Sequence, residues 1–296
     1  MRRTGVDVAN GAGTAFGTFG ELLQGALPDG ADFLVTMPID KGATAWFRLE
    51  PGGPLRVFPS HKSKSYELAR AMLGDAGGTL VLDGDLPVGK GLASSSADLV
   101  ATARAIGAAL GIPTSPEAVA DLLRSIEPTD GVMYSGVVAF EHRRVRLRRF
   151  LGALPPLSVV AVDEGGEVDT VAFNRVPKPY SARDRREYAS LLKRISQAVR
   201  TGDLATVGRV SSRSAELNQP LNPKRNLADM VRICHEAGGL GVICAHSGTM
   251  TGILLADQEP DHATRLARVV DACAALPGEV TVFRSHVFQK GGTDAA

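Results

Sequence analysis

The chain has few cysteines, few aromatic residues and almost no net charge. Its 296 residues include three cysteines, Cys234, Cys244 and Cys273, and none of them lies in a CxxC pair. An odd number of cysteines without such spacing argues against a disulfide framework or a zinc site and predicts reduced thiols. A formal net charge of +1 supplies no general field for nucleic acid or an anionic membrane, so neither is expected as a partner.

Long apolar segments are also missing from the sequence. No stretch approaches the roughly 20 apolar residues that span a bilayer, and the N-terminal stretch MRRTGVDVANGAGTAFG has no apolar core of signal-peptide length. With 44% hydrophobic and 22% charged residues, the composition is typical of a soluble globular protein, and we expect a cytoplasmic location. The sequence does not distinguish a monomer from a homodimer.

Short apolar runs bounded by proline and glycine alternate with longer amphipathic segments. The longer segments predict helices over 115–128 and 181–202, after a buried helix that runs from Ser94 to Gly111. Strands are expected at 33–39, 43–50, 55–58, 79–86 and 157–166, with a hairpin formed by GVVAFE and RRVRLRRF. This order lacks the regular rhythm of a doubly wound sheet and predicts the α+β class. Because the composition changes near residue 150, we expect two domains, 1–150 and 151–296.

The stretch PVGKGLASSSAD, residues 87–98, places a lysine, small residues and three serines at the start of the buried helix. Residues 84–90 match the GxxxxGK pattern of a P-loop, but Gly91 stands where that motif needs a magnesium-binding serine or threonine. A true P-loop is therefore not expected. The unpaired N–H groups and the dipole at a helix start favour a phosphate group there. The alternative is a capped helix whose small residues allow close packing.

The same stretch resembles the second signature of the GHMP kinase superfamily, PxxxGLxSSxA, in which a glycine- and serine-rich loop holds the phosphates of ATP. The named positions of that pattern are occupied by Pro87, Gly91, Leu92, Ser94, Ser95 and Ala97. The segment GTFGELLQG, residues 17–25, is similar to the N-terminal signature of the superfamily. The segment GVICAHSGTMTGIL, residues 241–254, is similar to the C-terminal one, although Met250 and Thr251 stand where a double glycine is common.

This resemblance covers nearly the whole chain and implies a two-domain GHMP kinase fold. The N-terminal domain is expected to be similar to domain 2 of ribosomal protein S5, and the C-terminal domain to be ferredoxin-like, with ATP and its acceptor in the cleft between them. Within the superfamily, the chain is most similar to the family of L-threonine kinases of cobalamin side-chain synthesis. That family combines GELxQG, GKGxASSxAD, EPTD and VDTxxFN segments, which match residues 20–25, 89–98, 127–130 and 168–174.

The likeness implies transfer of the γ-phosphate of ATP to the hydroxyl of L-threonine or a closely related hydroxy amino acid. Asp130 is the candidate base, although PTDG is also a common turn sequence. Lys90 is expected to reach a phosphate or to bridge to Asp130, with an exposed loop lysine as the alternative. Magnesium is assigned to Ser95, Ser96 and Glu127, and Glu127 has the alternative of a solvated helix end. ATP binding is assigned to Pro87, Gly89, Lys90, Gly91, Leu92, Ala93, Ser94, Ser95 and Ser96.

The acceptor site should complement both charged groups of a free amino acid. Acidic or amide groups suit the ammonium, and a cation or N–H donors suit the carboxylate. Asp169 or Glu21 is a candidate for the ammonium, whereas Lys41, Arg175 and backbone donors are alternatives for the carboxylate. The full acceptor set implied by the resemblance is Glu21, Gln24, Asp169, Thr170, Asn174, Ser247, Gly248 and Thr249.

Other functions remain open at this stage. Within the superfamily, a homoserine kinase or an isoprenoid-precursor kinase is the alternative. A non-catalytic RNA- or partner-binding module with an S5-like domain is a second one, although the basic stretch 143–150 is better explained as an exposed edge strand. Cys234-His235 and Cys244-x-His246 have no metal-site spacing, so buried thiols and an ordinary histidine are expected. Glycine-rich segments in three places favour the kinase, because an RNA-binding module does not need them.

Overall fold

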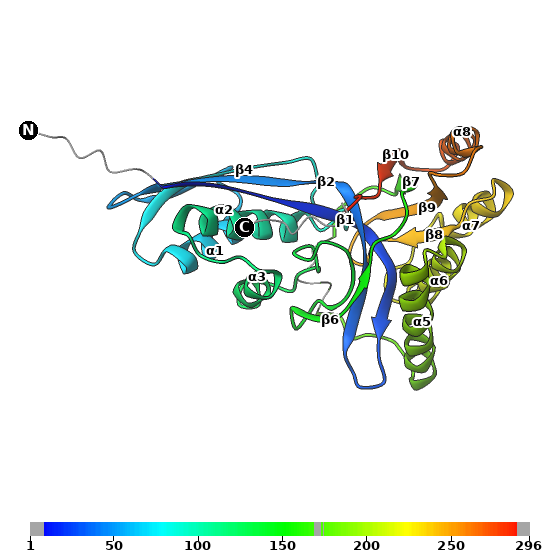
Figure 1. The fold of residues 1–296 in the computed structure, drawn as a ribbon. Helices are drawn as coiled ribbons and strands as arrows, with labels where there is room; N and C mark the ends of the chain where they lie inside the picture. The colour runs from blue at the N-terminus through cyan, green and yellow to red at the C-terminus, as the bar shows by residue number, and fades with distance from the viewer. Residues whose placement is uncertain (1–8, 169–172, 174, 289–296) are drawn as a thin grey trace, which may run out of the picture.

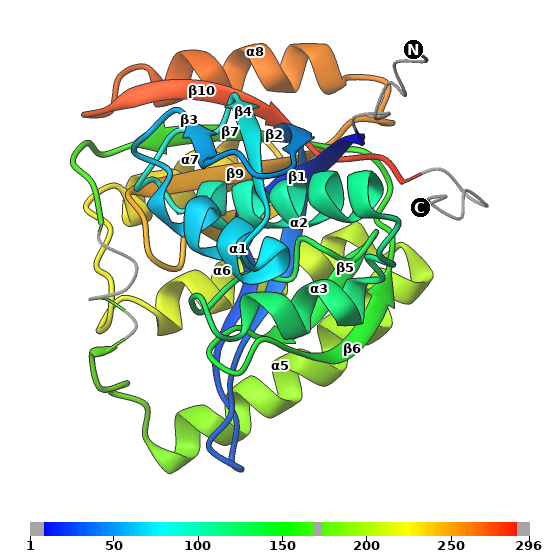
Figure 2. The same ribbon diagram turned by 90° about the vertical axis from the view of Figure 1, so that its left-hand side faces the viewer.

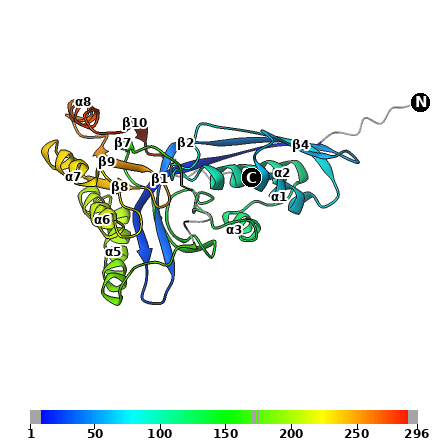
Figure 3. The same ribbon diagram turned by 180° about the vertical axis from the view of Figure 1, so that it is seen from behind.

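A long antiparallel hairpin runs through the middle of the molecule and connects its two halves (Figure 1). The computed structural model describes residues 9–168, 173 and 175–288. The hairpin consists of β1 (Asn10–Ala26) and β2 (Asp32–Glu50). One end of it carries helices of the N-terminal half, and its tip projects beside α5 (Ala182–Thr201) of the C-terminal half, as Figure 3 shows from behind.

The described strands form one sheet in the order β10-β7-β9-β8-β1-β2-β4-β3, and β5 pairs with both β2 and β6. β1 joins β8 at a single register pair, Glu21 with Cys244. At this pair, a strand from the first half of the chain meets one from the second half. The remaining strands are β3 (Leu55–Phe58), β4 (Gly77–Gly84), β5 (Val137–Glu141), β6 (Arg146–Gly152), β7 (Leu157–Asp163), β8 (Gly241–Cys244), β9 (Met250–Ala256) and β10 (Glu279–Arg284).

The helices cover the sheet in two groups. Figure 2 shows α2 lying along the sheet, with α8 and α5 at opposite ends of that view. Glycines in β1 let α2 approach closely, because a Cβ atom at Gly11 would lie 2.1 Å from the Ala105 carbonyl oxygen. Besides α5, the helices are α1 (Ser63–Leu73), α2 (Ser94–Leu110), α3 (Pro116–Leu123), α6 (Leu204–Leu217), α7 (Leu227–Glu236) and α8 (His262–Cys273).

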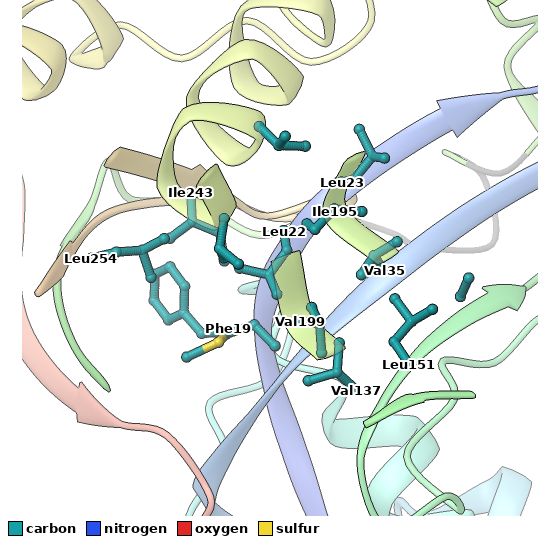
Figure 4. Packing of buried hydrophobic residues seen from close by; sticks show 14 of the residues in the cluster. Phe19, Leu22, Leu23, Val35, Val137, Leu151, Ile195, Val199, Ile243 and Leu254 are labelled. Carbon is teal, nitrogen blue, oxygen red and sulfur yellow. The ribbon is translucent and has the colours of Figure 1, made fainter. Parts of the chain in front are cut away.

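One hydrophobic core is shared by both halves of the chain. Figure 4 shows Phe19 and Leu22 of β1 close to Val199 of α5 and Leu254 of β9. Two further cores lie on either side, one around α2 and the other between β7–β9 and the helices α7 and α8. The predicted domains 1–150 and 151–296 therefore share buried surface, and the boundary between them stays a prediction.

Most expected elements are present, and the α+β class is confirmed. The predicted strands 33–39 and 43–50 form one strand, because a register irregularity opposite Phe16 and Thr18 of β1 absorbs the interruption by Pro38 and Gly42. The predicted helix 115–128 ends earlier, at Leu123. Residues 124–126 form turns in which the N–H groups of Ile126 and Glu127 both donate to the Leu123 carbonyl oxygen, and Glu127, the residue before Pro128, is not helical. β1 and α1 were not expected from the sequence.

The cysteines are free and buried, as their spacing led us to expect. Burial raises the pKa of each of the three thiols to about 11. No helix in the described parts of the chain is long and apolar enough to cross a membrane.

Tyr188 tests how α5 is held on the β1–β2 hairpin. Its side chain is 0% exposed, packs over Gly25 and makes an edge contact with the ring of Phe33. Tyr188→Ala is expected to lower the free energy of unfolding by about 3–5 kcal/mol, the usual loss for an aromatic side chain removed from a core. The matched control is Tyr66→Ala, whose residue is 42% exposed on α1. Urea denaturation of both variants measures the effect, and equal losses would contradict the packing role.

Candidate active site

The loop before α2 has the backbone geometry of an anion cradle. Gly89, Gly91 and Ala93 all have positive φ angles, of 72°, 81° and 59°. The N-cap residue of α2 is Ala93, whose methyl group offers no acceptor to the N–H groups of the first helical turn. These N–H groups and the positive end of the helix dipole are therefore directed at whatever occupies the adjacent space, and an anion is favoured there.

A pocket of about 500 Å³ opens beside this loop. It brings together residues from the three glycine-rich segments and from the EPTD segment. The predicted site residues that line it are Glu21, Gly89, Gly91, Leu92, Ala93, Ser94, Ser95, Ser96, Glu127, Asp130 and Ser247. Lys64, His142 and His246 also line it, although the sequence analysis assigned none of them to the site.

Both other glycine-rich segments contact the loop directly. The N–H groups of Thr18 and Gly20 in β1 donate to the carbonyl oxygens of Leu92 and Gly91, at 3.2 and 3.3 Å. Gly248 lies so close that a Cβ atom on it would be 2.1 Å from the Lys90 carbonyl oxygen. A glycine is required at 248 for this approach, since real Cβ atoms do not come so near to backbone.

Ser95 and Glu127 lie next to each other at the start of α2. The Ser95 hydroxyl donates to Glu127 Oε1 at 2.5 Å, and Lys64 of α1 forms an ion pair with the other carboxylate oxygen. Ser96 has a different partner, because its Oγ accepts from the N–H of Asp130 at 3.1 Å. The serines of the loop thus hold both acidic residues of the EPTD segment. Lys64 was missed because α1 itself was not predicted.

Two carboxyl groups of the pocket, those of Asp130 and Glu21, have raised pKa values. Burial, followed by repulsion from Glu127, raises the pKa of Asp130 to about 7. Burial, followed by repulsion from Asp130, raises the pKa of Glu21 well above its usual range. Glu21 is 3% exposed, and its Oε2 has no hydrogen-bond partner in the described structure. Both groups therefore favour a bound cation or a proton-donating ligand.

The side chain of Lys90 contacts the end of β7. Its Nζ is 2.7 Å from Asp163 Oδ2 at the end of β7, so the predicted bridge to Asp130 is replaced by one to Asp163. Burial alone would raise the pKa of Asp163, but hydrogen bonds from Lys90, Thr249 and the Gly165 N–H lower it overall. Spacing along the chain does not reveal this contact, because β7 comes beside the loop only in the folded sheet.

Gln24 and Thr249 support the pocket from outside its lining. Gln24 is fully buried and its side chain contacts His246 Nδ1 at 2.7 Å, while Thr249 donates to Asp163 Oδ1 at 2.5 Å. Of the carboxylate candidates, Lys41 lies 3.8 Å from Asp85, Arg175 is exposed, and neither is among the described residues of the lining. The predicted acceptor residues Asp169, Thr170 and Asn174 lie outside the described residues.

The residues beside the loop fit a magnesium ion that is also held by phosphates. Within the described ranges, no cluster of three or more His, Cys, Asp and Glu side chains is arranged to hold a metal ion by itself. Magnesium in phosphate-transferring sites typically has one or two carboxylates, with substrate phosphates and water completing its oxygen ligands. Glu127 and the Ser95 hydroxyl supply such oxygens at the mouth of the anion cradle.

Two family models match the chain, one in each half. Residues 62–140 match the GHMP kinases N terminal domain, and residues 195–275 match the GHMP kinases C terminal domain. The chain belongs to the GHMP kinase superfamily. The expected two-domain GHMP kinase fold is thereby confirmed. Members of this superfamily are phosphotransferases that use ATP and act on hydroxyl groups, so the protein is a kinase of a small alcohol.

Relatives of this GHMP kinase include enzymes with amino acid acceptors in their names. It is 26% identical to an L-threonine kinase of Citrobacter freundii, over 80% of this chain and 83% of the relative. It is 30% identical to a homoserine kinase of Moorella thermoacetica, over 62% of this chain and 66% of that relative. The solved structure of a homoserine kinase from Cytophaga hutchinsonii superposes with a TM-score of 0.71 at 17% identity, covering 98% of both chains, and supports the fold alone.

Gly91 and Gly30 provide a matched test of the phosphate cradle. Both have a φ of 81°, but a Cβ atom at Gly91 would lie 2.5 Å from Ala245 Cβ, whereas one at Gly30 would meet nothing within 4 Å. Each alanine substitution carries a similar backbone cost of about 1–2 kcal/mol. Only Gly91→Ala is expected to weaken ATP binding, by about tenfold or more, because it displaces the loop N–H groups. Calorimetry of ATP binding checks this, and a comparable loss in Gly30→Ala would refute it.

Proposed function

We propose that this GHMP kinase transfers the γ-phosphate of ATP to the side-chain hydroxyl of L-threonine or a closely related hydroxy amino acid. The observation that carries the proposal is Glu21, a buried carboxyl group whose Oε2 has no hydrogen-bond partner among the described residues, in the same pocket as the anion cradle and Asp130. A buried carboxylate without a counter-charge is costly, and an ammonium group supplies that charge. The similarity to an L-threonine kinase supports the same acceptor class.

In this proposal the loop 87–96 binds the triphosphate of ATP. The N–H groups at the start of α2 hydrogen-bond to phosphate oxygens, and the positive φ angles of Gly89 and Gly91 direct backbone donors toward them. Lys90 secures the loop through Asp163, which supports a positioning role for the lysine. Glu127 and Ser95 would hold the magnesium ion that accompanies ATP, which would supply positive charge to offset the negative charge of the phosphates.

Asp130 acts as the base for the acceptor hydroxyl. A base works best when its pKa lies near the working pH, and the pKa of Asp130 is raised to about 7. The hydroxyl oxygen forms the new bond to the γ-phosphorus, the bond to the β,γ-bridging oxygen breaks, and the hydroxyl proton passes to the carboxylate. The Ser96 hydroxyl accepts the 3.1 Å hydrogen bond from the Asp130 N–H, which fixes the position of Asp130 relative to the loop.

Glu21 binds the ammonium group of the acceptor. Its carboxyl is made hard to ionise by burial and by Asp130, and a bound ammonium would offset both effects. The same charge would ease the ionisation of Asp130, so that acceptor binding prepares the base. Whether the product enters cobalamin side-chain synthesis or another pathway depends on which hydroxy amino acid fits.

A substrate panel tests the proposed acceptor. The protein is incubated with ATP, magnesium and, in turn, L-threonine, L-serine, L-homoserine and mevalonate, and ADP release and phosphorylated product are measured. We expect the highest kcat/KM with L-threonine or a close analogue. A preference for homoserine or mevalonate would favour the alternative small-alcohol kinases, and RNA binding without turnover of any acceptor would favour the non-catalytic alternative.

Asp130→Asn separates catalysis from binding. The variant is expected to lower kcat by about 100-fold or more, because it removes the proton acceptor, while the Kd for ATP stays within a few-fold of the original. In the unaltered protein, kcat/KM should fall tenfold per pH unit below about 7, as Asp130 becomes protonated. Asp121→Asn, on the exposed face of α3, is the control. Near-normal turnover of Asp130→Asn would remove Asp130 as the base.

Asp130→Asn, which is expected to lower kcat, should raise the stability of the folded protein. A carboxyl whose pKa is raised on folding stabilises the native state at low pH and loses that contribution as the pH rises through its folded value. Asp130→Asn is therefore expected to raise the melting temperature most at pH 8, and by progressively less as the pH falls from about 7, the folded pKa of Asp130, to the pKa of an unfolded aspartate. An unchanged melting temperature at pH 8 would show that the carboxyl is not held in an unfavourable ionised state.

A further inference from the structure

One ring nitrogen of His246 is hydrogen-bonded to another side chain, and for the other no hydrogen-bond partner is seen in the described structure. Its side chain follows β8, lines the pocket and is 7% exposed. The Nδ1 atom lies 2.7 Å from Gln24 Oε1. The Nε2 atom is buried and has no hydrogen-bond partner in the described structure. A buried polar atom without a partner is costly, which points to a group that arrives with the ligand.

The orientation of Gln24 determines which nitrogen of His246 carries the proton. The Gln24 amide nitrogen lies 3.3 Å from the carbonyl oxygen of Cys244, which only accepts, so the amide group cannot be reversed without losing this bond. Gln24 Oε1 therefore faces His246 and accepts from an Nδ1–H. Burial first, and then the charges of His142, Lys178 and Lys224, lower the pKa of His246, so the ring is neutral. A neutral ring protonated on Nδ1 has a lone pair on Nε2.

Glu21 lies in β1 and His246 lies just after the neighbouring strand β8, and both side chains line the same pocket. Glu21 pairs in register with Cys244, two residues before His246. Each has an acceptor atom to which no described residue donates, Glu21 Oε2 and His246 Nε2. A hydroxyl group has one proton to donate and satisfies only one of them, whereas an ammonium group has three. The pair therefore matches a primary amine better than a single hydroxyl group.

The geometry points to His246 as a specificity-determining residue: its Nε2 accepts a hydrogen bond from the ammonium group of the acceptor, beside the Glu21 carboxylate. Gln24 is the positioning residue that keeps the proton on Nδ1. The rings of Phe173 and His142 pack against the imidazole at 5.1 and 5.0 Å and restrict its rotation. The inference rests on the proposed function and deepens it, since it selects acceptors that carry an amine over acceptors that do not.

The test measures the kinetics of His246→Phe with two acceptors, L-threonine and 3-hydroxybutyrate, which differ only in the amine. His246→Phe keeps a planar ring and removes the lone pair. With L-threonine its KM is expected to rise about 10- to 100-fold, the usual effect of losing a hydrogen bond to a charged group, with kcat and the KM for ATP little changed. With 3-hydroxybutyrate, a poor acceptor that lacks the amine, His246→Phe should cause no further loss. His235→Phe, on the exposed side of α7, is the control.

A spectroscopic measurement tests the tautomer without relying on turnover. In ¹⁵N-labelled protein, the Nε2 signal of His246 should have the shift of an unprotonated ring nitrogen from pH 6 to 9 and should move when L-threonine is added. Gln24→Leu should give a mixture of tautomers and a KM rise of several-fold, smaller than that of His246→Phe, because it removes only the acceptor of Nδ1–H. A merely structural role of Gln24 would change stability and leave the tautomer as it is.

The outcomes separate this inference from the proposed function. Equal losses of His246→Phe with threonine and with 3-hydroxybutyrate, or a protonated Nε2, would overturn the role of His246 while leaving hydroxy amino acid phosphorylation intact. Turnover of mevalonate but of no amino acid would overturn the proposed function and the inference together. If no acceptor is turned over, a protonated Nε2, or an Nε2 signal that does not respond to L-threonine, still overturns the inference.

Discussion

The close approach between the loop 87–93 and the turn at Gly248 is the constraint on which the site depends. With the Lys90 carbonyl only 2.1 Å from where a Cβ at 248 would lie, nothing larger than glycine fits. The same loop is hydrogen-bonded to β1 through Thr18 and Gly20. Because β1 also pairs with β8 at Glu21, one set of backbone contacts positions the anion cradle, the acidic residues and His246 relative to each other.

Acidic groups are concentrated in this pocket at a cost to stability. Glu21, Glu127 and Asp130 all line it, and the pKa values of Glu21 and Asp130 are raised. Glu127 forms an ion pair with Lys64, and no ion pair of Glu21 or Asp130 is seen among the described residues. Cations that bind in such a pocket would offset these charges, so cationic ligands are expected to stabilise the folded protein strongly. The unfavourable charges are thereby a source of affinity for cationic partners.

More of the pocket lining could be predicted from the loop 87–96 than from the segments that join it in the fold. Residues 87–96 form one continuous segment, and Glu127 and Asp130 belong to a second, so both sets could be assigned from local sequence. The pocket brings most of these residues together. His246 and Lys64 could not be assigned, since their roles depend on β8 reaching β1 and on α1 lying beside the loop. Helix ends with clear caps, such as Ser115, were predictable, whereas the continuous β2 depended on an irregular partner strand.

The complete burial of Gln24 has a consequence for interpreting related sequences. This side chain has no surface that a ligand can touch, yet it decides whether the imidazole facing the pocket offers a lone pair or a proton. Positions 24 and 246 therefore form one unit: a replacement at 24 alters the chemistry presented by 246 even when the histidine is retained. Sorting kinases of this fold by pocket-lining residues alone would overlook half of that unit and group together proteins that present opposite hydrogen-bonding groups to the same acceptor.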